Sequence, residues 1–258
     1  MNTLKEIWEY RTMIVNMVRR DLKGKYRGSV LGFFWTFLTP LLQLVVYTLV
    51  FSVIMRAGIE DYYLFLFVTL IPWSYFSNCL SIGSGCIVNQ KDLVVKIYFP
   101  REVLPISHVL AQLANMLLTF LVLIAVLLIS GKGINLMVWG YLIIVIFVET
   151  LLALGMTFLL SAITVFIRDL QYLMTIVVMA WQFLTPVMYS VDMVPENLRK
   201  LFYLNPMTPI IIAYRDIFYY KQAPQLSTLL LGTFMGVFFM VFGFFVFTKL
   251  KKRFAEVM

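Results

Sequence analysis

Few side chains in this sequence could perform covalent chemistry. The chain has one histidine, His108, so no Ser/His/Asp constellation can be assembled with any support. We expect His108 to be a packed or interfacial residue. The two cysteines, Cys79 and Cys86, fall late in one apolar segment, where buried small hydrophobes are more common than a disulfide or metal pair. The sequence therefore predicts no catalytic residue, no metal site and a chain that is not an enzyme.

A loop that would cradle the phosphates of ATP is also missing. The phosphate-binding pattern needs an upstream glycine before Gly-Lys and a Ser or Thr after it. Gly24-Lys25 and Gly131-Lys132 lack both features. We therefore expect no cofactor on this chain, and if ATP is used, another chain binds it.

One carboxylate stands inside an apolar segment. Glu149 lies in the stretch FVETLLALG. An ionisable group in a membrane span is a functional candidate by default. The alternative is a protonated or hydrogen-bonded glutamate that packs against another helix, and the sequence leaves both open.

Aromatic residues gather in three apolar segments. Sugar rings offer C–H faces and hydroxyl edges, which suit aromatic faces that carry hydroxyl or indole donors. Many other aromatics will face lipid or sit near the membrane interfaces. The clustered residues are Phe33, Phe34, Trp35, Phe37, Trp73, Tyr75, Trp181, Phe183 and Tyr189. Of these we predict seven as channel-lining: Phe33, Phe34, Phe37, Trp73, Tyr75, Trp181 and Tyr189.

The composition indicates the class of protein that must position these residues. The chain is 62% hydrophobic and 13% charged, whereas soluble domains are about 25% charged. It is predicted to be an all-α membrane protein with a single transmembrane domain over 1–258. The net charge of +8 does not indicate nucleic acid, because the cations cluster beside apolar segments and mark cytoplasmic ends.

Six transmembrane helices account for most of the chain. We expect them at 28–55, 62–87, 104–130, 136–167, 172–189 and 226–248. Fifteen of the 21 lysines and arginines then lie on the cytoplasmic side and six lie outside. This excess agrees with the positive-inside rule if both termini are cytoplasmic. Pro40 predicts a local break in the first span.

Three segments lie between or beside the spans. Residues 1–27 contain an amphipathic pattern that predicts an interface helix, acting either as an anchor or as a collar for a cytoplasmic partner. Between spans 2 and 3, we expect a short cytoplasmic helix that begins at an Asn89 cap and stops at Phe99-Pro100, or a loop held on the membrane surface. The apolar face of this helix would be formed by Val94, Val95 and Ile97. Residues 190–225 predict two short helices joined near Asn205-Pro206, favouring a re-entrant hairpin over an outer cap.

Several stretches together resemble a known family. They are RRDLKGKYRGSVLGFFWTFLTPLL (19–42), LVVKIYFPREVLPIS (93–107), FIRDLQY (166–172), FLTPVMYS (183–190) and LNPMTPIIIAYRDIFYY (204–220). The chain resembles the ABC-2 type permeases of polysaccharide exporters, which move O-antigen, capsular polysaccharide or teichoic acid. The resemblance covers nearly the whole chain, and it implies six spans, the interface helix, the coupling helix and the hairpin.

The resemblance also implies partners and sites. It implies a homodimer with two ATP-binding subunits that hold ATP and Mg, in a bacterial inner (plasma) membrane, with a lipid-linked glycan as substrate. The ATPase-coupling residues would be Asn89, Asp92, Leu93, Val94, Val95 and Lys96. The residues near a lipid-diphosphate headgroup would be Arg19, Arg20, Lys23, Lys25 and Arg27, unless these cations only anchor the topology.

Two other functions remain open on the sequence alone. One is an ABC-2 exporter of small hydrophobic drugs or lipids, which a channel lined mainly by aliphatic side chains would favour. The other is an integral membrane glycosyltransferase, which would usually need carboxylates beside a metal or a donor sugar.

Overall fold

The computed structural model describes residues 3–24, 28–54, 58–133 and 135–257. Within these ranges the chain is built from helices and turns and contains no β-strand. The all-α prediction is therefore confirmed for the part of the chain that the structure describes.

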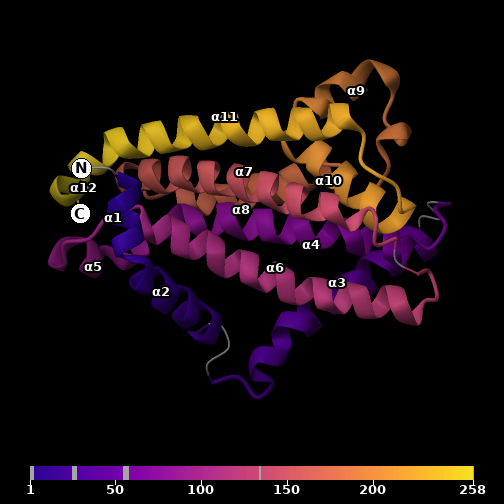
Figure 1. Cartoon of the computed structure of the whole chain (residues 1–258), viewed down its shortest axis with the longest axis horizontal. Helices are drawn as coiled ribbons and strands as arrows, with labels where there is room; N and C mark the ends of the chain where they lie inside the picture. The colour runs from indigo at the N-terminus through magenta and orange to yellow at the C-terminus, as the bar shows by residue number, and fades with distance from the viewer. Residues whose placement is uncertain (1–2, 25–27, 55–57, 134, 258) are drawn as a thin grey trace.

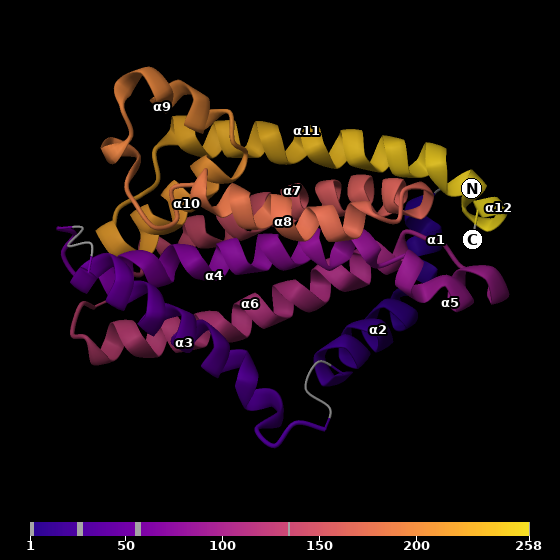
Figure 2. The same ribbon diagram turned by 180° about the vertical axis from the view of Figure 1, so that it is seen from behind.

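Long apolar helices form the body of the molecule. α4 (Tyr62–Ser81), α6 (Val103–Ile129), α7 (Trp139–Phe166) and α11 (Leu226–Leu250) run along its long axis (Figure 1). α3 (Trp35–Thr48), which continues as a π-helix over Leu49–Ile54, crosses α4 and α6 obliquely (Figure 2). The stretches long and apolar enough to cross a membrane are Trp35–Ser52, Tyr62–Gly85, Val103–Ile129, Trp139–Phe166 and Leu226–Arg253.

The helix expected over 172–189 is shorter than predicted. α8 spans Leu170–Phe183, and its 14 residues are an apolar helix below crossing length. At about 1.5 Å per residue it rises about 21 Å, against a hydrocarbon core of about 30 Å. Pro186 explains the early end, because it disfavours helical geometry at Thr185 and lacks an N–H of its own. In its described ranges the structure thus has five helices of crossing length, and a sixth crossing is not confirmed.

The broken end of α8 is satisfied by side chains from other elements. The Tyr62 hydroxyl donates to the carbonyl of Met188 at 2.9 Å, and the Thr69 hydroxyl donates to that of Val187 at 2.8 Å. Arg215 Nη2 donates to the carbonyl of Pro186 at 2.6 Å. Carbonyls at a helix end need such partners where water is excluded. α4 and α10 therefore hold the irregular segment after α8 in place.

α7 and α11 pack with almost no space between their backbones. A Cβ atom added to Gly243 would overlap the carbonyl oxygen of Gly155, and one added to Gly155 would overlap the backbone of Met240. Small residues allow this approach, which is common where helices pack inside membranes. The two helices therefore form one tightly joined pair.

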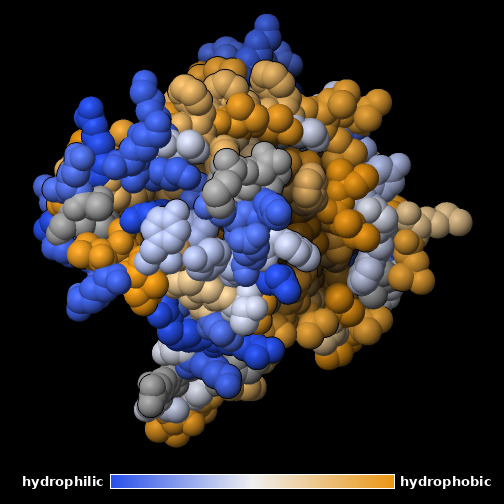
Figure 3. All heavy atoms as spheres, turned by 60° about the vertical axis from the view of Figure 1, so that its left-hand side comes forward, coloured by the Kyte–Doolittle hydropathy of each residue, from blue (hydrophilic) through white to orange (hydrophobic). Residues whose placement is uncertain are grey.

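The two ends of the bundle differ in character. α1 (Thr3–Glu9), α5 (Lys91–Lys96) and α12 (Phe254–Val257) lie together at one end, and α9 (Glu196–Tyr203) lies at the other (Figures 1 and 2). Hydrophilic residues gather at the end that carries the termini, beside a largely hydrophobic surface (Figure 3). The 88–104 loop therefore lies at the same end of the bundle as both termini.

The N-terminal amphipathic segment is two helices rather than one. α1 ends at Glu9 and α2 spans Arg11–Gly24. α2 packs against α6 through its buried residues Ile14 and Met17. Part of its apolar face thus contacts protein rather than lipid.

The segment 190–225 contains the two short helices expected from its sequence. α9 spans Glu196–Tyr203 and α10 spans Met207–Arg215, so the joint lies at 204–206. A 3₁₀ turn (Val191–Met193) precedes them and a π-helix (Asp216–Tyr220) follows. α10 is mostly buried against α4, α7 and α11, whereas α9 has no buried residue.

The short helix between spans 2 and 3 exists, but its start and apolar face differ from our prediction. α5 begins at Lys91 after a 3₁₀ turn over Val88–Gln90. Gln90 is its N-cap residue and makes no side-chain cap, so the predicted Asn89 cap was wrong. The 3₁₀ turn moves Asn89 one residue outside the capping position.

The helix is also shorter than the sequence indicated, because it ends at Lys96 rather than at Phe99-Pro100. Val94 is buried, whereas Val95 and Ile97 are exposed, so these three residues do not share one face.

Candidate functional site

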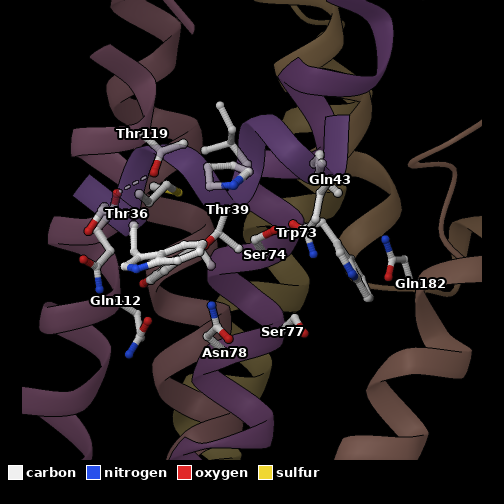
Figure 4. Close-up of a pocket in the computed structure, with 17 residues that line it drawn as sticks. Thr36, Thr39, Gln43, Trp73, Ser74, Ser77, Asn78, Gln112, Thr119 and Gln182 are labelled. Carbon is white, nitrogen blue, oxygen red and sulfur yellow. Dashed lines mark hydrogen bonds between the residues drawn. The ribbon is translucent and has the colours of Figure 1, made fainter. Parts of the chain in front are cut away.

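A partly open cavity of about 310 Å³ lies between α3, α4 and α6, and we call it the central cavity. Labelled side chains from these three helices converge on it, and Gln182 approaches from α8 (Figure 4). Ligand pockets in proteins commonly begin at about this volume. It is therefore a candidate functional site.

Uncharged polar side chains supply most of the lining. On each of the three helices, two lining residues lie three or four positions from a third, which places the set on one helix face. The sets are Thr36, Thr39 and Gln43 on α3; Ser74, Ser77 and Asn78 on α4; and Gln112, Asn115 and Thr119 on α6. Hydroxyl and amide groups both donate and accept hydrogen bonds, as the hydroxyls of a sugar do.

Two of these side chains have buried polar atoms that are not hydrogen-bonded. They are Oγ1 of Thr36 and Oδ1 of Asn115, neither of which has a partner among the described residues. Buried polar atoms are normally paired with protein or with water. Both residues line the cavity, so its wall contains polar atoms that the described residues leave unpaired.

Aromatic side chains complete the lining. Trp73 and Tyr75, both predicted as channel-lining, border the cavity, and so does Trp35. Tyr75 donates its hydroxyl to Thr150 Oγ1 at 3.4 Å, and Trp35 donates its indole N–H to Ser29 Oγ at 2.9 Å. These two hydrogen bonds fix the orientation of the Tyr75 and Trp35 rings and occupy the hydroxyl and the indole N–H of those side chains.

The lining contains no Asp, Glu, Lys, Arg or His among the described residues. A neutral lining gives no strong hold on a charged group and offers no general acid or base. It suits the neutral, hydroxyl-rich part of a substrate rather than a phosphate or an ammonium group.

The other predicted aromatic residues lie away from this cavity. Trp181 packs edge-on against Phe76 and donates to Asn205 Oδ1 at 3.0 Å. Tyr189 donates its hydroxyl to the carbonyl of Phe183 at 2.7 Å. Phe34 is exposed and packs against Phe37, and the side chain of Phe33 lies outside the described residues. A channel role for these residues stays a prediction.

The basic cluster before α3 is only partly described. Arg19, Arg20 and Lys23 are exposed on α2, and Lys25 and Arg27 lie outside the described residues. Arg20 borders a second cavity, of about 410 Å³, which shares Gln112 with the first. Arg20 Nε is 3.8 Å from Asp21 Oδ1, so part of its charge is already balanced. Contact with a lipid diphosphate stays a prediction.

The predicted coupling residues lie at the end of the bundle that carries the termini. Asn89, Asp92, Val95 and Lys96 are exposed, Leu93 is half-buried and Val94 is buried. Asp92 and Lys96 form an exposed ion pair of 3.2 Å along α5. Val94 therefore fixes α5 to the bundle, and the exposed side is the part available to another chain.

The embedded polar residues are mostly packed. Glu149 is fully buried and accepts a hydrogen bond of 2.6 Å from the Tyr214 hydroxyl. His108 is buried with Nε2 at 3.3 Å from the carbonyl oxygen of Asn78. Both cysteines are free, and Cys79 is fully buried. The prediction of a packed histidine is confirmed, and of the two cysteines predicted as buried, Cys79 is buried and Cys86 is half-buried.

Comparison with known proteins decides the family. The model of a family described as ABC-2 type transporter matches residues 12–219. The chain belongs to this family.

Curated relatives match over nearly the full length. The chain is 34% identical over 257 residues to a protein from Myxococcus xanthus named O-antigen export system permease protein RfbA, covering 98% of each chain. Two proteins of the same name from Klebsiella pneumoniae are 30% and 31% identical over 247 residues, covering 95% of each chain.

Membership makes this ABC-2 transporter chain a transport subunit rather than an enzyme. For the central cavity, the sequence predicted the aromatic residues Trp73 and Tyr75. It missed the polar lining residues Thr39, Gln43, Asn115 and Gln182. The signal that could have found most of the lining was the regular spacing of uncharged polar residues in otherwise apolar helices.

Proposed function

We propose that this chain is the transmembrane permease subunit of an ATP-driven exporter that moves a lipid-linked, O-antigen-like polysaccharide from the cytoplasm across the inner membrane. The central cavity carries the proposal, because its lining combines neutral hydrogen-bonding groups with aromatic faces and has no charged side chain in the described ranges. The names of the three curated relatives support the same cargo.

The energy source would be a separate ATP-binding subunit with its Mg, docked on the exposed side of α5. Val95, Ile97 and Tyr98 expose apolar surface there, at 56%, 52% and 76% of their full areas. Exposed apolar side chains at the charged end of a membrane protein are costly unless a partner covers them. Two such subunits would serve two copies of this chain.

A second copy would complete the transport path. α8 exposes several large apolar residues, and Gln182 on the same helix reaches the cavity. We infer that the polysaccharide passes between two protomers, in the manner of a homodimeric channel. The sixth crossing would be completed by α8 together with the irregular residues 184–189, which α4 and α10 enclose.

The remaining features fit this arrangement. α1 and α2 would lie at the cytoplasmic interface, and the hairpin of α9 and α10 would dip into the outer half of the membrane. Arg19, Arg20 and Lys23 would then lie near the inner surface, where the lipid diphosphate begins its transfer.

The alternatives receive less support. An exporter of small hydrophobic compounds would be expected to have an aliphatic cavity, whereas this one is rich in amides and hydroxyls. A glycosyltransferase would need a carboxylate at its site, and the embedded Glu149 is instead bonded to Tyr214 outside the cavity lining.

A pair of matched substitutions tests the proposal in cells. Thr39→Val removes a hydroxyl from the cavity, and Thr12→Val makes the same change on the exposed surface of α2. We expect Thr39→Val to lower the rate at which polysaccharide reaches the cell surface by about three- to tenfold, the worth of one hydrogen bond. Thr12→Val should leave the rate unchanged.

The same assay contains the decisive control. A strain that lacks this chain should retain the polysaccharide inside the cell. If such a strain still shows normal surface polysaccharide, the chain does not export it and the proposal fails.

A further inference from the structure

A third cavity lies at the end of the bundle opposite the termini, beside α9. Its volume is about 310 Å³. Its lining comes entirely from the segment between α8 and the first turn of α11. We call it the outer cavity. Its polar lining residues are Ser190, Asp192, Tyr203, Arg215, Asp216, Tyr220, Gln222, Gln225 and Thr228.

Arg215 is the buried charge of this cavity and is only partly hydrogen-bonded. Its side chain is 3% exposed, and Nη2 donates to the carbonyls of Pro186 and Val187 at 2.6 and 3.3 Å. Nε has no hydrogen-bond partner among the described residues. A buried donor without an acceptor is rare in folded proteins. Arg215 thus lines the outer cavity, and its Nε is a buried donor that the described residues leave unpaired.

Asp216, the next residue in the sequence, also lines the outer cavity. It is 6% exposed, and its Oδ1 accepts a hydrogen bond of 3.0 Å from Gln222 Nε2. In the described ranges its other carboxylate oxygen receives no hydrogen bond. Ser190 Oγ donates to Asp192 Oδ2 at 3.0 Å, and both of these residues line the cavity as well. The lining therefore contains both donors and acceptors on side chains that are held by hydrogen bonds.

This mixture selects the kind of ligand. An anion would meet two carboxylates, and a cation would meet the buried guanidinium of Arg215. A group that donates and accepts at once, such as a sugar hydroxyl, suits a lining that combines a guanidinium, carboxylates and side-chain amides. Tyr203 and Tyr220 add partly exposed rings, which can pack on the C–H face of a sugar.

We propose that the outer cavity binds a neutral saccharide unit of the exported chain at the outer end of the transport path. The inference rests on the proposed export function and assigns a second sugar site in addition to the central cavity. A glycan held at both places would be less free to slip back during a transport cycle.

Protection of a single engineered cysteine tests the site directly. Gln225→Cys introduces a thiol at the rim of the outer cavity, and Lys200→Cys introduces one on α9, outside the lining. The full chain, in complex with its ATP-binding partner in lipid nanodiscs, is treated with a hydrophilic maleimide. Labelling of the unmodified chain supplies the background from Cys79 and Cys86.

The probes are methyl glycosides of glucose, galactose, mannose and N-acetylglucosamine, with sodium phosphate and choline as anionic and cationic comparisons. We expect at least one glycoside to slow labelling of Gln225→Cys, by about tenfold at ten times its dissociation constant. Labelling of Lys200→Cys should not change. Phosphate and choline should give no protection.

Second substitutions in the Gln225→Cys background connect protection to the named residues. Asp216→Asn and Tyr220→Ala should each reduce the protection that the glycoside gives. Tyr220→Phe should retain most of the protection because the ring face remains. Protection by phosphate or choline alone, equal protection at Lys200→Cys, or no protection by any glycoside overturns the proposal.

Export is measured separately, so the two proposals can fail independently. If no glycoside protects Gln225→Cys but the parent chain exports glycan normally, the outer site is refuted and the proposed export function stands. Normal surface polysaccharide in cells without the chain removes the exporter, whatever the labelling shows.

Discussion

Tyr214 on α10 donates a hydrogen bond of 2.6 Å to Oε2 of Glu149 on α7. Both side chains are completely buried, and Oε1 of the glutamate has no hydrogen-bond partner in the described ranges. The bond joins the hairpin of α9 and α10 to the centre of the bundle. Glu149 is thus explained first as a packed, hydrogen-bonded residue that holds α10 in place.

Substitutions at this pair should show strong coupling. Tyr214→Phe leaves the carboxyl group without a donor, and we expect a loss of about 1–3 kcal/mol in stability. Glu149→Gln retains an acceptor and should cost less. Thermal unfolding of the purified complex provides the measurement. In a double-mutant cycle, the effects of Tyr214→Phe and Glu149→Ala should not add, and simple additivity would refute a direct role for the bond.

Val95 should be decisive for coupling to the ATPase, whereas Val94 should be decisive for folding. Val95→Asp places a charge on the exposed apolar side of α5, and we expect stimulated ATPase activity to fall by about tenfold or more. Membrane insertion should be normal. Asp92→Ala, which removes the exposed ion pair with Lys96, should act in the same direction.

The control for Val95→Asp is Leu198→Asp, because Leu198 is an exposed leucine on α9 at the other end of the bundle. It should leave ATPase activity near the parent value. Full stimulation in Val95→Asp would show that α5 is not the docking element.

Gly243 should tolerate no side chain. In Gly243→Ala, the new methyl group would overlap the Gly155 carbonyl oxygen, so α7 and α11 must separate. We expect the free energy of unfolding of the variant to fall by about 1–3 kcal/mol, or the variant to fail to accumulate in the membrane. Gly140→Ala is the matched control, because its Cβ would meet nothing within 4 Å. Equal expression and melting temperature for the two variants would contradict this packing.

The carboxyl group of Asp21 on α2 should weaken the fold at neutral pH. Burial raises its pKa above the usual 3.8, although Arg20 and His108 oppose the shift. A carboxyl group whose pKa is higher in the folded state than in the unfolded state contributes most to the free energy of unfolding below its unfolded-state pKa. This contribution falls as the pH rises through the folded-state pKa. Asp21→Asn should therefore be more stable than the parent at pH 7, and the difference should shrink toward pH 4. A gap that widens on acidification would reverse the assigned sign.

Long apolar runs were enough to predict most of the helices. α6, α7 and α11 start and stop within about three residues of the expected bounds, because uninterrupted apolar sequence must be helical in lipid. α8 departed from prediction because tertiary partners such as Arg215 allow the chain to unwind around Pro186. Arg215 lies 29 residues from Pro186, and Tyr62 and Thr69 lie 126 and 118 residues from Met188 and Val187, so no local pattern reveals these partners.

The site was predicted less well than the fold. Trp73 and Tyr75 were identified from ring chemistry, yet Trp181 and Tyr189 share that chemistry and have other packing partners. Which face of a helix points inward depends on its neighbours, and an almost wholly apolar span gives little amphipathic contrast. The sets of uncharged polar residues provide that contrast and are the better guide.

The close contact of α7 with α11 limits how the molecule can change shape. Where Gly155 meets Gly243, no side chain separates the two backbones, so the helices cannot slide past one another there without a clash. Tyr214 adds α10 to the same unit through Glu149. These three helices would move as one rigid body during a transport cycle, and hinge motion would fall to α3 and α8. Widening of the path would then occur on one side of each protomer only, where α3 and α8 border the central cavity.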